Sequence, residues 1–296
     1  MKNFKYNSAI NYSGYRLGQS PLTRTYPSKK EILEDLLLLE GEFYYLRMYD
    51  CTEHLHSTLE LIEEHQLNFQ VMIGLSMHAE ENHINHPFFY IHKEDVLKDN
   101  VAKNDVLITE IIEISKKYEK YISSISIGNE TRSTCNNNRV SIARLVDTAN
   151  RLKKNTNKPI TFCEEYQTWI EELQPLSEVV DFISLHTYPA WQECKIEDAI
   201  DVAIKNFNQV QDMFKDKLCI ITETGWPTNS HGSRILIEDA TIENQKIYNE
   251  QITKWGKENN TLVYLFEAFD EPWKGGDDPD EPEKNWGIYF ENRERK

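Results

Sequence analysis

Two glutamates in this sequence each follow a short apolar segment rich in β-branched residues. Residues 218–222 lead directly into Glu223. Residues 122–127 are followed, two positions on, by Asn129 and then Glu130. Segments of this kind predict buried parallel strands, and α/β barrels place their reactive groups at the carboxyl ends of such strands. One isolated glutamate would be better explained as a solvated loop residue. Two of them predict paired carboxylates, which suit glycoside hydrolysis: one protonates the leaving oxygen while the other attacks the sugar carbon or activates a water there.

Eight strand-like segments alternate with helix-like segments along the chain, and no linker or internal repeat divides it. The strands are expected at residues 6–13, 43–48, 69–75, 122–127, 159–163, 179–186, 218–222 and 261–269. Strict alternation of strands and helices predicts a parallel sheet, and eight units in 296 residues predict closure into a barrel. The expected fold is one (β/α)8 TIM barrel domain spanning residues 1–296, with Glu130 and Glu223 at the ends of strands four and seven.

The expected helices follow from apolar residues at helical spacing. The first begins after Ser28, where Ser28 and Glu31 are typical of a capping box, and ends before Gly41. The others are expected near residues 55–66, 101–119, 142–154, 200–214 and 240–257. Residues 76–100 are predicted to form a long loop, because this segment is rich in histidine, asparagine and aromatic residues and contains Pro87. No strong helix is expected after the eighth strand.

The composition argues against several kinds of partner. The chain has 33 Lys and Arg against 49 Asp and Glu, a formal net charge of −16, so nucleic acids and anionic membrane surfaces would be repelled. A neutral substrate such as a sugar fits this charge. No apolar segment reaches the length of a secretory signal core or of a membrane span. The five cysteines are dispersed without a CxxC pair, which is typical of buried, inert thiols. These features favour a cytoplasmic location.

Three motifs in this order resemble glycoside hydrolase family 17, the β-1,3-glucanases and related glucanosyltransferases. They are Gly-Asn-Glu at 128–130, Glu-Thr-Gly-Trp-Pro at 223–227 and Phe-Glu-Ala-Phe-Asp-Glu-Pro-Trp-Lys at 266–274. Segments at 9–13, 47–49 and 285–288 support the resemblance, which therefore covers most of the chain. The resemblance implies a retaining mechanism, with Glu130 as general acid/base and Glu223 as the nucleophile that forms a covalent glycosyl-enzyme. Retention implies carboxyl groups roughly 5–5.5 Å apart.

The same resemblance implies a set of substrate-binding residues. Asn129 would bind the sugar 2-hydroxyl, Tyr188 would hold the nucleophile, and Trp273 would stack on a sugar ring. The full expected set is Asn129, Tyr12, Arg47, Tyr188, Glu271, Trp273 and Lys274. Each has an alternative structural explanation: a loop-capping asparagine, a tyrosine or tryptophan that fills the barrel rim, or a surface ion pair of little energetic value. His186 is more often a satisfied buried histidine than a reactive group, and we expect a supporting role for it.

Two clusters of potential metal ligands are better explained without a metal. His78, His83 and His86 lie in the long loop, which contains Pro87 and offers no helical i, i+4 pair of ligands. The acidic residues of segment 277–283 fit a solvated loop better than a calcium site. We therefore expect no metal and no cofactor.

Several functions remain open. Hydrolysis of β-1,3-glucan or its oligosaccharides is the first, and the long segment 76–100 suggests an exo-acting pocket closed at one end. A glucanosyltransferase would pass the same covalent intermediate to a sugar. A barrel glycosidase for another linkage would share both glutamates but has no reason to carry all three motifs. A non-catalytic glucan-binding barrel is disfavoured because it needs neither an acid nor a nucleophile.

Overall fold

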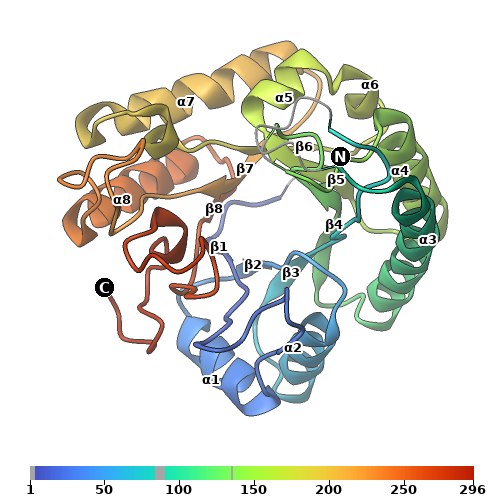
Figure 1. The fold of residues 1–296 in the computed structure, drawn as a ribbon, viewed down its shortest axis with the longest axis horizontal. Coiled ribbons are helices and arrows are strands. Elements are labelled where there is room, and N and C mark those ends of the chain that lie inside the picture. Colours follow the sequence, from blue (N-terminus) through green and yellow to red (C-terminus); the bar gives the residue numbers. More distant parts are fainter. Residues whose placement is uncertain (1–3, 84–90, 135) are drawn as a thin grey trace.

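Eight parallel strands, each hydrogen-bonded to its neighbours, close into a barrel in which β1 pairs with both β2 and β8. The computed structural model describes residues 4–83, 91–134 and 136–296 (Figure 1). The strands are β1 (Ala9–Asn11), β2 (Tyr45–Arg47), β3 (Gln70–Gly74), β4 (Ile122–Asn129), β5 (Ile160–Glu165), β6 (Ile183–His186), β7 (Cys219–Thr224) and β8 (Val263–Leu265). The predicted barrel is confirmed, with Glu130 directly after β4 and Glu223 near the end of β7.

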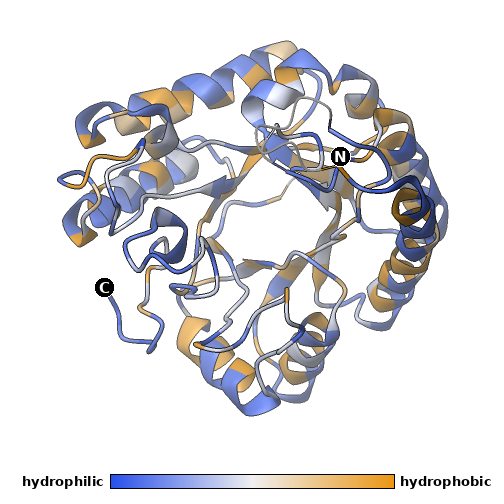
Figure 2. Cartoon of the chain, in the orientation of Figure 1, coloured by the Kyte–Doolittle hydropathy of each residue, from blue (hydrophilic) through white to orange (hydrophobic). Residues whose placement is uncertain are grey.

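The longer helices form an outer layer around the strands (Figure 1). They are α1 (Lys29–Leu39), α2 (Glu53–Glu64), α3 (Glu94–Lys117), α4 (Ile142–Asn155), α7 (Ile196–Met213) and α8 (Ile242–Glu258). The shorter elements are α5 (Tyr166–Glu171) and α6 (Gln174–Ser177) after β5, η1 (Pro189–Gln192) after β6 and η2 (Pro282–Lys284) after β8. Figure 2 shows the outer helices carrying both hydrophilic and hydrophobic residues, as expected of helices that cover a barrel with one face.

Local sequence explains how α1 begins. Ser28 Oγ accepts a hydrogen bond from the backbone of Glu31, and Glu31 Oε2 accepts one from the backbone of Ser28 at 2.8 Å. This reciprocal pair satisfies two backbone N–H groups that the first turn would otherwise leave without partners. The predicted capping box is confirmed.

The prediction for the third helix was wrong at its start. Helix α3 begins at Glu94, not near residue 101, so the loop after β3 is shorter than the predicted segment 76–100. Residues 94–100 are mostly polar and exposed, and they show little apolar periodicity from which a helix could be predicted. The helix is instead favoured by its dipole: Glu94 and Asp95 lie in the first turn, where negative charges are stabilised by the positive end of the dipole. The predicted loop residues His86 and Pro87 lie outside the described residues.

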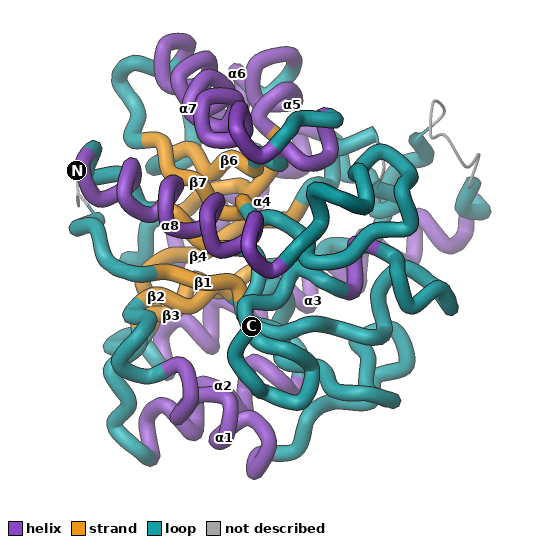
Figure 3. The backbone as a smooth tube through the Cα atoms, turned by 90° about the vertical axis from the view of Figure 1, so that its left-hand side faces the viewer, coloured by secondary structure: helices purple, strands orange, loops and turns teal. Residues whose placement is uncertain are grey.

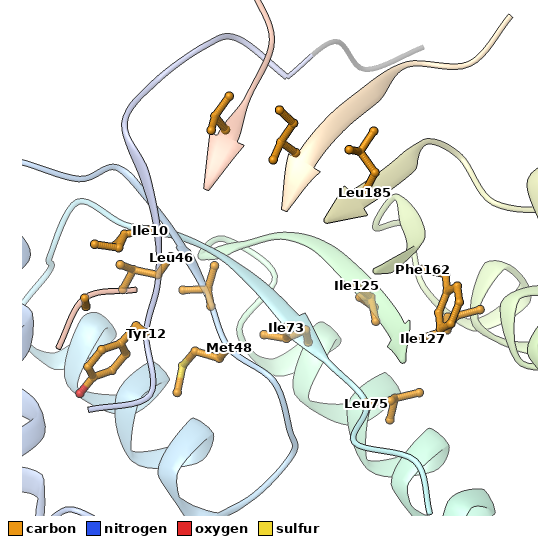
Figure 4. Packing of buried hydrophobic residues seen from close by; sticks show 14 of the residues in the cluster. Ile10, Tyr12, Leu46, Met48, Ile73, Leu75, Ile125, Ile127, Phe162 and Leu185 are labelled. Atoms are coloured by element: carbon orange, nitrogen blue, oxygen red, sulfur yellow. The ribbon is translucent and has the colours of Figure 1, made fainter. Parts of the chain in front are cut away.

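Successive residues of a strand face opposite sides, so the apolar side chains of the strands belong to two hydrophobic clusters, one outside and one inside the barrel. Ile10, Leu46, Ile73, Ile125 and Leu185 point outward from their strands into the main hydrophobic cluster under the helices (Figure 4). Residues one position away point inward. A second cluster therefore fills the interior of the barrel, formed by Ala9, Tyr45, Met72, Cys163, Phe182, Ile220, Leu262 and Tyr264. The polar residues that follow along the same inward faces emerge at the carboxyl ends of the strands.

The last strand and the segment after it depart from the predicted pattern. Strand β8 ends at Leu265, whereas a strand to residue 269 was predicted. Residues beyond it turn away and pair with the C-terminal segment, as in the bridge between Phe269 and Tyr289. This segment is anchored by ion pairs of 2.7 Å from Arg293 to Asp35 on α1 and from Lys296 to Asp270. As predicted, no long helix follows β8 in the described part of the chain.

The loops gather on the side of the barrel where the strands end (Figure 3). A groove of about 520 Å³ lies elsewhere, on the outer wall between α8 and the C-terminal residues, and is lined by Tyr6, Lys254 and Arg295 among others. None of its lining residues belongs to the carboxylate pair. Over the residues described, every helix is too short or too polar to cross a membrane.

Candidate active site

The two predicted glutamates meet at the carboxyl ends of the strands. One oxygen of Glu130, one oxygen of Glu223 and a ring nitrogen of His186 all lie within 4.8 Å of one another. The Glu223 side chain is only 6% exposed, whereas that of Glu130 is 27% exposed. The inner carboxylate is therefore held by protein groups, and the outer one can reach a bound molecule and water.

Glu130 has an unusual backbone conformation. Its φ angle is 50°, in the left-handed region that costs a non-glycine residue roughly 1–2 kcal/mol. The Glu130 N–H donates to the carbonyl oxygen of Cys163 at 2.9 Å, and its own carbonyl accepts from Ser133 at 3.1 Å. These bonds hold the turn that directs the carboxylate over the end of the barrel. Such strain, observed at a titratable residue, is typical of a functional site.

Two hydrogen-bond donors hold the carboxylate of Glu223. Arg47 Nη1 donates to Oε1, and the hydroxyl of Tyr188 donates to Oε2 at 2.6 Å. Burial by itself would raise the pKa of Glu223, but the positive charges of His186 and Arg47 and these hydrogen bonds lower this pKa to about 2. Glu223 is therefore ionised at neutral pH, as a nucleophile must be.

Arg47 links residues from four strands. It is fully buried at the end of β2, and its guanidinium also donates to Asn11 Oδ1 at 2.9 Å and to Asn129 Oδ1. A guanidinium offers several donors in a planar arrangement, so one side chain can orient several acceptors. Arg47 thus positions Glu223 together with Asn129. The sequence predicted a substrate-binding role for Arg47, and the structure places it beneath the carboxylates.

His186 bridges the pair. Its Nδ1 lies 2.6 Å from Glu130 Oε1, and its Nε2 lies 3.5 Å from Glu223 Oε1. Burial by itself would lower the pKa of His186, but the charge of Glu223, the neighbouring Cys163 and the hydrogen bond with Glu130 raise it to about 10. The imidazole is therefore protonated at neutral pH. A supporting role was predicted for His186, and the structure places it between the two carboxylates.

The distances among Glu130, His186 and Glu223 would suit a metal ion, and theirs is the only such group found among the described residues. The donor set does not fit one. A protonated imidazole has no free electron pair for a metal, and the guanidinium of Arg47 already occupies Glu223 Oε1. The three side chains are instead paired with one another and with Arg47.

A second charged cluster lies at the end of β8. The ammonium of Lys274 lies 2.6 Å from both carboxylate oxygens of Glu267 and 3.0 Å from Glu271 Oε2. Both glutamates are 1% exposed, so the cluster is buried, and the alternative of a surface ion pair is wrong. Burial, and then the charge of Glu271, raise the pKa of Glu267 well above its ordinary value, although Lys274 opposes this.

Sequence reasoning missed Glu267. Its signal was its place in the strand-eight motif, two positions after the last strand residue. Aromatic rings flank this side of the site as well. Trp273 packs edge-on against Tyr15 with ring centroids 6.0 Å apart, and its indole nitrogen has no hydrogen-bond partner in the described structure. That nitrogen is buried, and the stacking of Trp273 on a sugar ring stays a prediction.

Tyr12 is the predicted site residue that the structure places elsewhere. Its side chain is fully buried, and its hydroxyl donates to Asp35 on α1 at 3.3 Å. Figure 4 shows it with the hydrophobic cluster outside the barrel. Because strand residues alternate, Asn11 points inward to Arg47 and its neighbour Tyr12 points outward. The substrate-binding role predicted for Tyr12 is corrected to a structural one.

Several further residues close to the strand ends have structural roles. Glu164 is fully buried and accepts hydrogen bonds from the backbones of Arg132 and Glu165, both at 2.9 Å. Trp169 and Trp226 are also fully buried, and each indole donates to a backbone carbonyl. They support the loops around the site.

A closed parallel barrel with an ionised inner glutamate and an accessible outer one at its strand ends defines the class of barrel glycosidases. A family model confirms this: the BtgE/BtgC glycoside hydrolase domain matches residues 9–287. The chain belongs to this family.

Two fungal proteins illustrate the sequence similarity. A protein of Aspergillus flavus, named "Probable glucan endo-1,3-beta-glucosidase btgC", is 26% identical over 276 residues, covering 86% of this chain and 37% of that protein. A glucan 1,3-beta-glucosidase of Arthroderma benhamiae is 28% identical over 131 residues, covering 40% of this chain and 41% of that protein. The chain thus spans about two-fifths of the length of these curated relatives.

Solved structures show the same fold. An endo-laminarinase from Formosa Hel1_33_131 matches with a TM-score of 0.82 and 24% identity, covering 97% of this chain and 84% of that chain. An active-site mutant of the Rhizomucor miehei β-1,3-glucanosyltransferase, in complex with laminaritriose, matches with a TM-score of 0.75 and 19% identity, covering 98% and 95%. At these identities the similarity establishes the fold.

Proposed function

We propose that this protein is a retaining glycosidase of the family 17 type that cleaves β-1,3-glucosidic bonds in glucan or its oligosaccharides. The observation that carries this proposal is the carboxylate pair, whose oxygens approach within 4.8 Å. Retaining enzymes hold their two carboxyl groups roughly 5–5.5 Å apart, and inverting enzymes hold them farther apart to admit a water. The names of the fungal relatives and of the two solved structures support the β-1,3 linkage.

The residues have distinct roles in this proposal. Glu223 attacks the anomeric carbon while Glu130 protonates the leaving oxygen, and Glu130 then deprotonates the water that releases the sugar. Arg47 and Tyr188 orient Glu223 and keep it ionised. Asn129 faces the sugar ring beside Glu130, and Trp273 offers an aromatic surface to an adjacent sugar.

Transfer to a sugar acceptor is the second candidate. It uses the same covalent intermediate, and the similarity to the Rhizomucor miehei glucanosyltransferase spans nearly the whole of both chains. Exo action remains a prediction. Its basis was the long loop after β3, which α3 shortens, and the Aspergillus flavus relative is named an endo-acting enzyme.

The test is incubation of the purified protein with a β-1,3-linked glucohexaose, with products resolved by size over time. Cleavage supports the proposed linkage. Glucose alone indicates exo action, mixed fragments indicate endo action, and products longer than the hexamer indicate transfer. A folded protein that binds the hexaose without converting it would instead be a glucan-binding barrel.

The nucleophile is tested by Glu223→Ala, which we expect to abolish turnover while leaving the fold intact. Glu238→Ala is the matched control, because Glu238 is an exposed glutamate in the loop after the same strand. Wild-type turnover by a folded Glu223→Ala variant would refute the assignment.

A further inference from the structure

The imidazole of His186 lies between the two carboxylates and is sealed from solvent. Its side chain is 0% exposed. One nitrogen is 2.6 Å from Glu130 Oε1, and the other is 3.5 Å from Glu223 Oε1. A ring that contacts both carboxylates of the pair can exchange a proton with one while it responds to the charge of the other.

The charged groups around this ring come from four strands. Glu130 follows β4, Glu223 lies on β7, and Arg47 on β2 reaches Glu223. From β5, the buried Cys163 and the carboxylate of Glu165 also act electrostatically on His186. The adjacent Tyr188 hydroxyl is committed to Glu223. Two carboxylates thus stabilise the imidazolium directly, and the pKa of about 10 agrees with this arrangement.

We propose that Glu130 and His186 share the proton used for acid–base catalysis, so that His186 holds it whenever Glu130 is ionised. This inference rests on the proposed function and deepens it. His186 is then a positioning residue that acts through Glu130. In the resting site both carboxylates are anionic and the imidazole is cationic.

The first step forms the covalent glycosyl-enzyme. The proton passes from His186 Nδ1 to the Glu130 carboxylate and from there to the leaving oxygen, as the bond from the anomeric carbon to that oxygen breaks. A bond forms between the anomeric carbon and a Glu223 oxygen. Glu130 is again an anion, His186 is neutral, and Glu223 has become an uncharged ester.

The second step reverses these changes. A water oxygen, or a sugar hydroxyl, bonds to the anomeric carbon while the ester bond to Glu223 breaks. The proton of that water or hydroxyl passes to Glu130 and on to His186 Nδ1. The charge of Glu223 therefore disappears when His186 loses its proton and returns when His186 regains it, so the net charge of the buried site is unchanged.

The first test uses His186→Asn, because the asparagine amide can still donate to Glu130 from about the position of Nδ1 but stores no proton. The pH profile of kcat/KM is measured on the β-1,3-glucohexaose. We expect the wild type to stay active into the alkaline range and the basic limb of the variant to move down by about one pH unit or more. His56→Asn should leave the profile unchanged, because His56 is a half-buried histidine on α2 that pairs with Glu110, away from the two carboxylates.

A second substrate separates proton delivery from binding. A dinitrophenyl β-laminaribioside needs no proton on its leaving group, so His186→Asn should reduce kcat/KM on the hexaose about 10-fold more than on the aryl glycoside. Equal losses on both substrates, with wild-type and variant profiles of the same shape, would overturn the proposal. Failure of the wild type to cleave either substrate would instead refute the proposed function.

A measurement on the wild type covers the case in which the variant does not fold. Nitrogen-15 NMR of labelled histidine follows the titration of His186 before and after the nucleophile is trapped with a 2-fluoro glycoside. The pKa of His186 should fall by about one unit or more on trapping, because the charge of Glu223 is lost. An unchanged pKa would overturn the proposal.

Discussion

At the scale of single residues, Glu223 depends on donors that come from other strands. Tyr188 supplies the bond to Oε2 at 2.6 Å, and Arg47 supplies the bond to Oε1. Loss of the two donors has different consequences. Loss of the guanidinium would leave Asn11 and Asn129 without their shared partner, whereas loss of one hydroxyl changes one bond.

We expect Tyr188→Phe to lower kcat/KM about 10- to 150-fold, because a hydrogen bond to a charged group contributes about 1.5–3 kcal/mol. The bond stabilises the ionised form of Glu223, so its loss raises the pKa of Glu223 and moves the acidic limb of the pH profile to higher pH. Initial rates across pH check both effects. Tyr45→Phe, at the opposite end of the barrel, is the control, and an unmoved acidic limb would contradict the argument.

The site residues show what sequence could and could not predict. Glu130 and Glu223 were predictable because strand-end carboxylates follow from a local pattern of a few residues. Tyr12 was misassigned and Asn11 was overlooked because the facing of a strand of three residues depends on its register against β2 and β8. The central place of His186 was not predictable, since its position matters only through residues on β4 and β7.

At the scale of elements, the end of β8 carries three ionisable side chains on a buried surface. Lys274 neutralises part of the charge of Glu267 and Glu271, which have left the strand but remain 1% exposed. Removing one partner of a buried ion pair leaves the other charge uncompensated. This destabilises the fold more than replacing both partners by apolar residues.

We expect Lys274→Met to lower the free energy of unfolding by about 3–5 kcal/mol at neutral pH. Without the ammonium, the pKa of Glu267 in the folded state rises further above its unfolded value. Such carboxyls bind more protons when folded, so stability is lost as pH rises through the folded pKa. The deficit should therefore be smaller at pH 5 than at pH 8 in denaturant titrations.

Lys254→Met is the control for this experiment, because the Lys254 side chain is 75% exposed on α8 and forms an ion pair with Glu258 in the same helix. A deficit for Lys274→Met that is the same at both pH values would show that packing, not charge, is what Lys274 contributes.

Element boundaries were predictable where local chemistry determines them. The start of α1 follows from a capping box within four residues. The start of α3 was not predictable, because polar residues 94–100 carry no periodic signal and are held by the longer helix they extend. The early end of β8 depends on pairing with residues near 289, a contact that no local window contains.

At the scale of the whole molecule, the net charge of −16 should select among glucans. A carboxymethylated β-1,3-glucan meets repulsion that a neutral one does not. We expect KM for the neutral hexaose to be nearly independent of salt, and KM for the carboxymethylated polymer to fall several-fold between about 0.01 and 0.5 M salt as screening increases. Equal salt dependence for both substrates would contradict this.

The ion pair between Asp35 and Arg293 joins positions 258 residues apart. Asp35 is completely buried beneath the first loop, and Arg16 is its other cationic partner. During synthesis, α1 leaves the ribosome with this carboxylate long before its main counter-charge has been made. The first helix is thus not expected to take its final place until the segment that carries Arg293 has been made, and the ring of strands should close in a single late event.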